Sequence, residues 1–374
     1  MKKVLVVFGT RPEAIKMIPV AKELQKHQDL FETKICSTGQ HRQMLDQVMG
    51  FFGVSADFEL NVMSPNQTLS DVTCKVIKGM ENVFAQWRPD VVLVQGDTTT
   101  VMAAALAAFY ARIPVGHVEA GLRTGDIYSP YPEEMNRLLA TRMAAIHFAP
   151  TATSRENLLR ENVDPATVHI TGNTVIDALF DALKLIDSNS ALLAELEKMF
   201  SFLVPTKKLV LITGHRRENF GDGFLQICRA IADLAQRDDV QLVYPMHLNP
   251  NVRKPVNEIL GNCKNVHLIE PLDYPAFLYM MRKSYLILTD SGGVQEEAPS
   301  LGKPVIVMRD TTERPEAVTA KTVVLAGACR DTIFDYAVRL LDDQEFYNSM
   351  AKAINPYGDG LASERISKLI AEKF

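Results

Sequence analysis

Short apolar runs rich in Val, Ile and Leu alternate with longer amphipathic segments along almost the whole chain. The runs lie at 4–8, 33–36, 91–94, 115–118, 146–149, 209–213, 241–244, 285–289 and 305–308. After the first run, apolar residues recur at helical spacing from Ala14 to Leu24,. Strands that are apolar on both faces and separated by helices belong to parallel sheets covered on both sides. The sequence therefore predicts an α/β fold.

The chain is long enough for two such sheets. It has 374 residues, and single domains usually run to roughly 100–200,. The segment FGTRPE at 8–13 is echoed by TGHRRE at 213–218, each a strand that enters a glycine turn. Apolar runs restart at 209 after a polar, helical stretch. We expect two doubly wound domains facing a cleft, with ligands at the carboxyl ends of the strands.

Composition narrows the class of protein. The chain is 47% hydrophobic and 23% charged, with a net charge of -5, which favours neither nucleic acid nor a membrane surface as partner,. The apolar run at 4–8 is shorter than the roughly 7–15 residues of a secretory signal, and no run approaches the ~18–20 of a membrane span,. The five cysteines are dispersed, which indicates neither a disulfide framework nor a metal site,. We expect a reduced, cytoplasmic protein.

A glycine turn at 289–298 is the most informative local pattern. Gly292 and Gly293 follow a predicted strand, so backbone N–H groups and a helix dipole can hold a phosphate, and Glu297 can accept hydrogen bonds from a ribose,. The alternative is that the glycines only permit a tight turn. The charged segment 309–316 follows the last strand and is interpreted as a second ligand-facing loop.

Two familiar nucleotide fingerprints are missing from the sequence. No Gly-x-Gly-x-x-Gly follows a predicted strand, and no Gly-x-x-x-x-Gly-Lys-Ser/Thr loop is present,. A tightly bound dinucleotide is therefore not supported, and no redox cofactor is expected.

Carboxylates end or follow successive strands of the first half. Asp97 and Glu119 come directly after strands, and Glu133 begins a predicted helix. Each alone could cap a helix or accept a buried hydrogen bond. Three at the same edge of one sheet favour general acid/base catalysis.

Basic residues occupy the two matching turns. The first turn contributes Arg11 and Lys16, and the second contributes His215, Arg216 and Arg217. Lys16 and Arg217 could equally be ordinary surface cations, whereas His215 ends an apolar strand at a glycine turn and is interpreted as a ligand. Trp87, Met44 and Met49 are expected in the core.

Taken together, these motifs closely resemble those of the bacterial non-hydrolysing UDP-N-acetylglucosamine 2-epimerases. The matching segments are FGTRPEA (8–14), GDTTT (96–100), GHVEAGLRT (116–124), SPYPEE (129–134), GHRRE (214–218), DSGG (290–293), RDTTERPEAV (309–318) and NPYGDG (355–360). The likeness covers essentially the whole chain.

The resemblance implies a fold and an activity. It implies two Rossmann-like domains in a GT-B arrangement, over 1–172 plus 356–374 and over 173–355, with the C-terminal helix returning to the first domain. It implies reversible epimerisation of UDP-N-acetylglucosamine to UDP-N-acetylmannosamine through elimination of UDP to 2-acetamidoglucal, without a cofactor. A homodimer that supplies precursors for bacterial surface polysaccharide is implied as well.

The resemblance also assigns residues. Its catalytic set is Asp97, Glu119, Glu133 and His215, with Lys16 in support. Its UDP site is Arg11, Phe277, Ser291, Gly292, Gly293, Glu297 and Arg314. A second, activating UDP-N-acetylglucosamine would contact Gln40, Gln43, Arg216 and His247.

Three other functions stay open at this stage. A hydrolysing epimerase would release UDP and N-acetylmannosamine. A GT-B glycosyltransferase would use the acidic residues to hold an acceptor. A silent nucleotide-sugar sensor would need the glycine turn but not the three carboxylates.

Overall fold

The computed structural model describes residues 1–39, 42–64, 66–214 and 216–374, and not the side chains of residues 42, 43 and 217. The chain divides into two compact units, Met1–Asp181 with Tyr357–Phe374 and Ala182–Pro356. The domain bounds expected from the sequence stay a prediction. Within the described residues, no helix is both long and apolar enough to cross a bilayer.

Unit 1 is built on a parallel sheet in the order β3-β2-β1-β4-β5-β6-β7. The strands are β1 (Lys2–Phe8), β2 (Phe31–Ser37), β3 (Phe58–Glu59), β4 (Val91–Gln95), β5 (Val115–Val118), β6 (Ile146–Ala149) and β7 (Val168–Ile170). The order reverses direction beside β1, so the carboxyl ends of β1, β4 and β5 are neighbours. Ligands of open parallel sheets bind at such a point.

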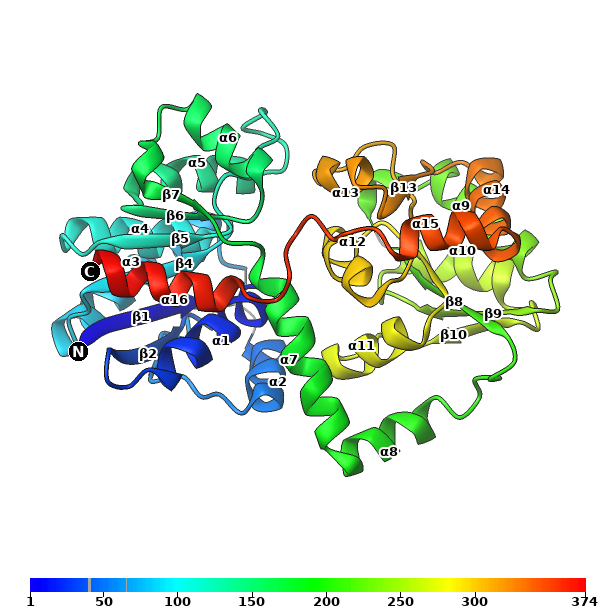
Figure 1. The fold of residues 1–374 in the computed structure, drawn as a ribbon, viewed down its shortest axis with the longest axis horizontal. Coiled ribbons are helices and arrows are strands. Elements are labelled where there is room, and N and C mark those ends of the chain that lie inside the picture. Colours follow the sequence, from blue (N-terminus) through cyan, green and yellow to red (C-terminus); the bar gives the residue numbers. More distant parts are fainter. Residues whose placement is uncertain (40–41, 65, 215) are drawn as a thin grey trace. The chain divides into compact units, whose positions relative to one another are not determined.

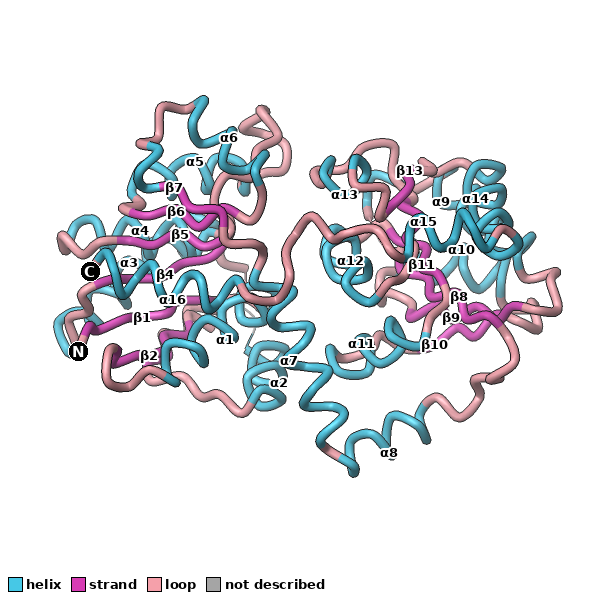
Figure 2. The backbone as a smooth tube through the Cα atoms, in the orientation of Figure 1, coloured by secondary structure: helices cyan, strands magenta, loops and turns pink. Residues whose placement is uncertain are grey.

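Helices cover both faces of this sheet (Figures 1 and 2). They are α1 (Arg11–Lys26), α2 (Arg42–Phe52), α3 (Leu69–Gln86), α4 (Thr99–Tyr110), α5 (Glu133–Met143), α6 (Ala152–Arg160) and α16 (Ala362–Lys373). Leu5 and Val7 of β1 pack with α3 and α4, while Val4 and Val6, equally buried, point to the opposite face,. The apolar surface of both faces is thereby removed from water.

Unit 2 repeats the design with a parallel sheet in the order β10-β9-β8-β11-β12-β13. Its strands are β8 (Lys208–Thr213), β9 (Val240–Pro245), β10 (Val266–Ile269), β11 (Leu286–Thr289), β12 (Val305–Val307) and β13 (Val323–Leu325). Its helices are α8 (Ser190–Met199), α9 (Asp222–Leu234), α10 (Pro250–Leu260), α11 (Tyr274–Lys283), α12 (Gly292–Glu297), α13 (Pro315–Thr319), α14 (Arg330–Asp342) and α15 (Gln344–Ala351). Helix α7 (Thr174–Ser188) runs from one unit into the other.

The predicted α/β class with two doubly wound sheets is confirmed. All nine predicted strands are present, and α16 returns to unit 1, where it packs against α1 (Figure 1). The sequence missed β3, β7, β10 and β13, which are the edge strands of the two sheets. Trp87 and Met49 are buried as expected, but Met44 is 44% exposed, because α2 turns that side outward.

Candidate functional site

Asp97 lies in the turn between β4 and α4. Its carboxylate accepts hydrogen bonds from Nε and Nη2 of Arg137, the former at 3.2 Å, and its carbonyl accepts from Nδ2 of Asn136 at 2.9 Å. Both donors belong to α5 and are buried, whereas the Asp97 side chain is 27% exposed. The carboxylate is therefore anchored and still reachable by a ligand.

Glu119 follows β5 and forms the second anchored carboxylate. Its φ of 60° is a left-handed conformation that non-glycine residues rarely adopt, and such strain is often found at functional sites,. Lys16 Nζ lies 2.7 Å from both carboxylate oxygens. Gln95 donates to Oε2 and Asn173 to Oε1, the latter at 3.3 Å. These bonds hold the Glu119 carboxylate close to the turn that carries Asp97. Its Oε2 lies 4.0 Å from the position that a Cβ on Gly96 would occupy.

Glu133 and Glu134 open α5 and differ in their surroundings. Glu134 is buried and accepts from the backbone N–H groups of Thr124 and Gly125, each at 3.1 Å, and from Arg137 at 2.7 Å. The Oε2 of Glu133 is buried with no hydrogen-bond partner among the described residues. A buried carboxylate oxygen costs free energy when it is unpaired. The two neighbouring carboxylates therefore differ: Glu134 is fully engaged by described groups, whereas one oxygen of Glu133 is not.

The first turn of α1 contains a buried acid, Glu13. Its Oε2 accepts from the N–H groups of Gly9 and Thr10, at 3.2 and 2.8 Å, and its Oε1 accepts from Thr98 Oγ1 at 2.8 Å. Burial raises the pKa of Glu13 to about 7, although the hydrogen bonds from Thr10, Thr98 and Gly9 lower it,. The side chain ties the turn that carries Arg11 to the turn that carries Asp97.

In unit 2, buried polar groups hold the turn after β8. Asp290 is fully buried, and its Oδ2 accepts from the backbone N–H of Arg216 at 2.8 Å. Tyr244 of β9 donates its hydroxyl to the carbonyl of Gly214 at 2.8 Å. The ends of β8, β9 and β11 are thereby fixed relative to one another.

The glycine turn after β11 begins the short helix α12. The Ser291 N–H donates to Thr289 Oγ1 at 2.9 Å. A side chain at Gly292 would collide with Arg314, because a Cβ there would stand 2.5 Å from Arg314 Cζ. Arg314 in turn donates to Glu296 and Glu313, each at 2.8 Å. The absence of a side chain at Gly292 thus leaves room for the guanidinium of Arg314.

Glu297 ends α12 and is buried beside an aromatic residue. Tyr274 donates its hydroxyl to Glu297 Oε1 at 3.1 Å, and both residues are buried. Burial and the neighbouring Glu297 raise the pKa of Tyr274, so the phenol stays protonated and remains a donor. Phe277 is half-buried on the same helix as Tyr274.

Comparison with known proteins gives one family. The family model described as UDP-N-acetylglucosamine 2-epimerase matches residues 22–371. The UDP-N-acetylglucosamine 2-epimerase of Escherichia coli O157:H7 is 59% identical over 365 residues, which cover 97% of each chain. The chain belongs to the UDP-N-acetylglucosamine 2-epimerase family.

Solved structures agree with this family. The UDP-GlcNAc 2-epimerase of Neisseria meningitidis, crystallised with UDP-GlcNAc, is 52% identical, with a TM-score of 0.92 over 99% of this chain and 100% of that one. The co-structure of S. aureus MnaA with UDP is 46% identical, with a TM-score of 0.86 over 100% and 96%. The resemblance stated from the motifs is therefore confirmed.

Within unit 1, the structure brings the predicted acidic residues to the carboxyl edge of the sheet. Asp97 and Glu119 end neighbouring strands, Lys16 pairs with Glu119, and Glu133 begins the helix whose Arg137 holds Asp97. Arg11 is exposed at the start of α1 and pairs with no side chain of the described residues.

Within unit 2, the predicted UDP residues also gather. Ser291, Gly292 and Gly293 form the start of α12, Arg314 lies against Gly292, and a Cβ on Gly293 would stand 3.8 Å from Glu297. The roles of all these residues remain predictions.

Of the residues expected at a second ligand site, two have described side chains. Arg216 contacts Asp290 through its backbone, and the exposed His247 accepts the Asn249 N–H at 3.1 Å on Nδ1. Gln43 is described only as a position in α2. Gln40 and the predicted catalytic His215 lie outside the described residues.

Sequence reasoning missed the residues that hold the carboxylates. They are Arg137, which bridges Asp97 and Glu134, and Gln95 and Asn173, which hold Glu119. Arg137 is only 4% exposed. The spacing of polar and apolar residues along α5 does not reveal that burial. Across the ranges the structure describes, no group of three or more His, Cys, Asp or Glu residues is arranged to hold a metal ion.

Proposed function

We propose that the chain interconverts UDP-N-acetylglucosamine and UDP-N-acetylmannosamine without hydrolysing the sugar–nucleotide bond to free sugar. The observation that carries this is the set of carboxylates at one edge of the unit 1 sheet. Glu119 is neutralised by Lys16, Asp97 is held by Arg137, and Glu133 keeps an unpartnered oxygen. Acid/base chemistry needs carboxylates that are held in place and remain within reach of the substrate.

Elimination and re-addition fit these groups best. Carbon 2 of the sugar has no neighbouring carbonyl, so simple proton abstraction and return would be slow. Instead, a base takes the proton from carbon 2 while the bond from carbon 1 to the diphosphate oxygen breaks, which gives 2-acetamidoglucal and UDP. UDP then adds back to carbon 1 and an acid delivers a proton to the opposite face of carbon 2. We assign Asp97, Glu119 and Glu133 to these transfers, with the direction of each left open.

Cations must stabilise the departing diphosphate. We propose that UDP occupies the start of α12, with Ser291, Gly292 and Gly293 on phosphate, Glu297 on the ribose and Phe277 near the uracil. Arg314 lies beside this turn, and Arg11 and His215 complete the diphosphate contacts. The family relatives crystallised with UDP-GlcNAc or UDP support this class of ligand.

Incubation with UDP-N-acetylglucosamine alone separates the alternatives. An epimerase yields an equilibrium mixture with UDP-N-acetylmannosamine and no net free UDP. Accumulating UDP and N-acetylmannosamine would favour the hydrolysing reaction, and no reaction without an acceptor would favour a glycosyltransferase. Proton NMR of the anomeric region distinguishes the three.

We also propose that a second UDP-N-acetylglucosamine activates turnover through Gln40, Gln43, Arg216 and His247. The support is the family resemblance at these positions. A ligand that favours the active conformation should give sigmoidal forward kinetics. Hyperbolic kinetics, together with full reverse rate from pure UDP-N-acetylmannosamine, would exclude the activator.

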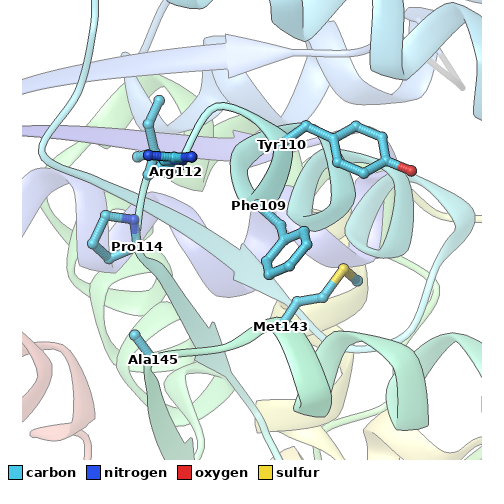
Figure 3. Close-up of a pocket in the computed structure, with 7 residues that line it drawn as sticks. Phe109, Tyr110, Arg112, Pro114, Met143 and Ala145 are labelled. Carbon is cyan, nitrogen blue, oxygen red and sulfur yellow. The ribbon is translucent and has the colours of Figure 1, made fainter.

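We propose a cytoplasmic homodimer that supplies a surface-polysaccharide precursor. The proposed dimer surface would include exposed apolar residues of α4 and α5, namely Phe109, Tyr110, Met135 and Leu139. Phe109 and Tyr110 line a hollow of about 590 Å³ at the amino ends of β5 and β6, where Phe109 points towards Met143 (Figure 3). Exposed apolar residues that gather on one face often mark protein interfaces.

A further inference from the structure

A buried histidine lies beneath the turn that carries Asp97. His117 is fully buried in β5, and its Nε2 stands 2.7 Å from the carbonyl oxygen of Gly96. The N–H of Gly96 donates to the carbonyl oxygen of Val118 at 3.0 Å. Both polar groups of Gly96 are therefore bound by successive residues of the neighbouring strand.

Gly96 is a point of backbone freedom in this turn. Its φ of 78° lies in the left-handed region, where glycine is free to vary,. The carbonyl of Gly96 and the N–H of Asp97 belong to one planar peptide group. A hydrogen bond to that carbonyl therefore fixes the plane from which the Asp97 backbone continues.

The imidazole acts here as a permanent donor. Burial lowers the pKa of His117 to about 3, so the ring is neutral at physiological pH. Because a carbonyl can only accept, Nε2 carries the proton and Nδ1 does not. Nδ1 is buried with no partner among the described residues, which excludes a proton relay through other described side chains.

We propose that His117 is a positioning residue that sets the orientation of Asp97 through the peptide between Gly96 and Asp97. This inference rests on the proposed function, in which Asp97 takes part in proton transfer. Asn136 and Arg137 also hold Asp97, so loss of His117 loosens the carboxylate without releasing it.

Unit 2 contains an equivalent interaction. Tyr244 lies on β9, the neighbour of β8, and donates to the carbonyl of Gly214 in the turn after β8. In both units a buried donor on the adjacent strand holds the glycine that precedes a predicted catalytic residue. The repetition indicates a requirement of the turn rather than an accident of packing.

The experiment compares two amides at residue 117. Gln places its Nε2 where the imidazole has its own, and Asn is too short to reach Gly96. We expect His117→Asn to lower kcat about 10–100-fold with KM within about 3-fold, and His117→Gln to restore most of the rate. The matched control is His147→Asn, because His147 is a buried histidine of β6 in register with His117 that bonds Thr141 instead. The control should keep kcat within about 3-fold.

An Asp97→Asn background shows whether the effect runs through Asp97. In that background, adding His117→Asn should lower kcat by less than about a further 2-fold. The reason is that the carboxylate that His117 positions is already replaced. Equal rates for His117→Asn and wild type, equal losses in the Asn and Gln variants, or a full further loss in the Asp97→Asn background would each overturn the proposal.

A measurement that does not depend on catalysis tests the positioning role separately from the proposed function. Hydrogen exchange over residues 95–98 should be at least about tenfold faster in His117→Asn than in His117→Gln. Wild-type protein that makes no UDP-N-acetylmannosamine would refute the proposed function, and the exchange result would still decide whether His117 holds the turn. Equal exchange in the two variants would refute the positioning role.

Discussion

Asp97 keeps its carboxylate reachable although Arg137 binds it. Asp97→Asn preserves shape and an acceptor for Arg137 but removes the charge that takes a proton. We expect kcat to fall by ~10²–10⁴ with affinity for UDP nearly unchanged, as measured by steady-state kinetics and calorimetry. Asp233→Asn, in an exposed pair with Arg330, is the control and should leave both quantities unchanged. Normal turnover in Asp97→Asn would remove this residue from the mechanism.

Glu13 gives stability an unusual pH dependence. Its folded pKa is raised to about 7 from an ordinary 4.5, so it favours the folded state below pH 4.5, and that contribution is lost as pH rises to 7,. Relative to Glu13→Gln, wild type should lose roughly 2–3 kcal/mol of unfolding free energy between pH 4.5 and 7. Denaturant titrations at both pH values measure the difference. Parallel profiles for the two proteins would mean that folding leaves the pKa of Glu13 unchanged.

At the residue scale, the sequence predicted the groups that could do chemistry but not those that hold them. Asp97 and Glu119 end apolar strands, where a carboxylate is conspicuous. Arg137 and Asn173 are ordinary polar residues in sequence, and only the fold brings them to Asp97 and Glu119. Their contacts join segments far apart along the chain, which local patterns do not encode.

At the scale of elements, central strands were predictable and edge strands were not. A central strand is buried on both faces and shows a continuous apolar run, as in Val91–Gln95,. The four edge strands have two to four residues and are partly exposed, so no such run marks them. The start of α5 at Glu133 was predictable from the proline-rich loop before it,.

The loop after β5 offers a test of how tightly elements are packed near the site. Gly121 has a φ of 95°, and a Cβ there would lie 2.2 Å from the carbonyl oxygen of Ser154 in α6. Gly121→Ala should therefore cost about 2–4 kcal/mol of unfolding free energy. Gly125→Ala, with φ of 83° and nothing within 4 Å, carries only the backbone strain of about 1 kcal/mol,. Equal losses of unfolding free energy in the two variants would show that α6 shifts easily to accommodate the added methyl group.

For the whole molecule, the proposed dimer surface makes a separate prediction. Leu139→Asp places a charge on an exposed helix position and should weaken dimerisation about tenfold or more, as seen by light scattering across a dilution series,. Leu30→Asp, at a similarly exposed leucine outside α4 and α5, should leave the mass unchanged. A Leu139→Asp protein with wild-type mass at every concentration would place the interface elsewhere.

The central claim is that UDP leaves the sugar and returns to it in every turnover. The most direct measurement uses UDP-N-acetylglucosamine with heavy oxygen in the bridge between carbon 1 and phosphorus. If the bond breaks, the freed diphosphate end can rotate before re-addition, and label should appear in nonbridging phosphate oxygens of product and recovered substrate. Phosphorus NMR resolves the two positions. Label that stays in the bridge while the sugar epimerises rapidly would contradict elimination and the roles assigned to the three carboxylates.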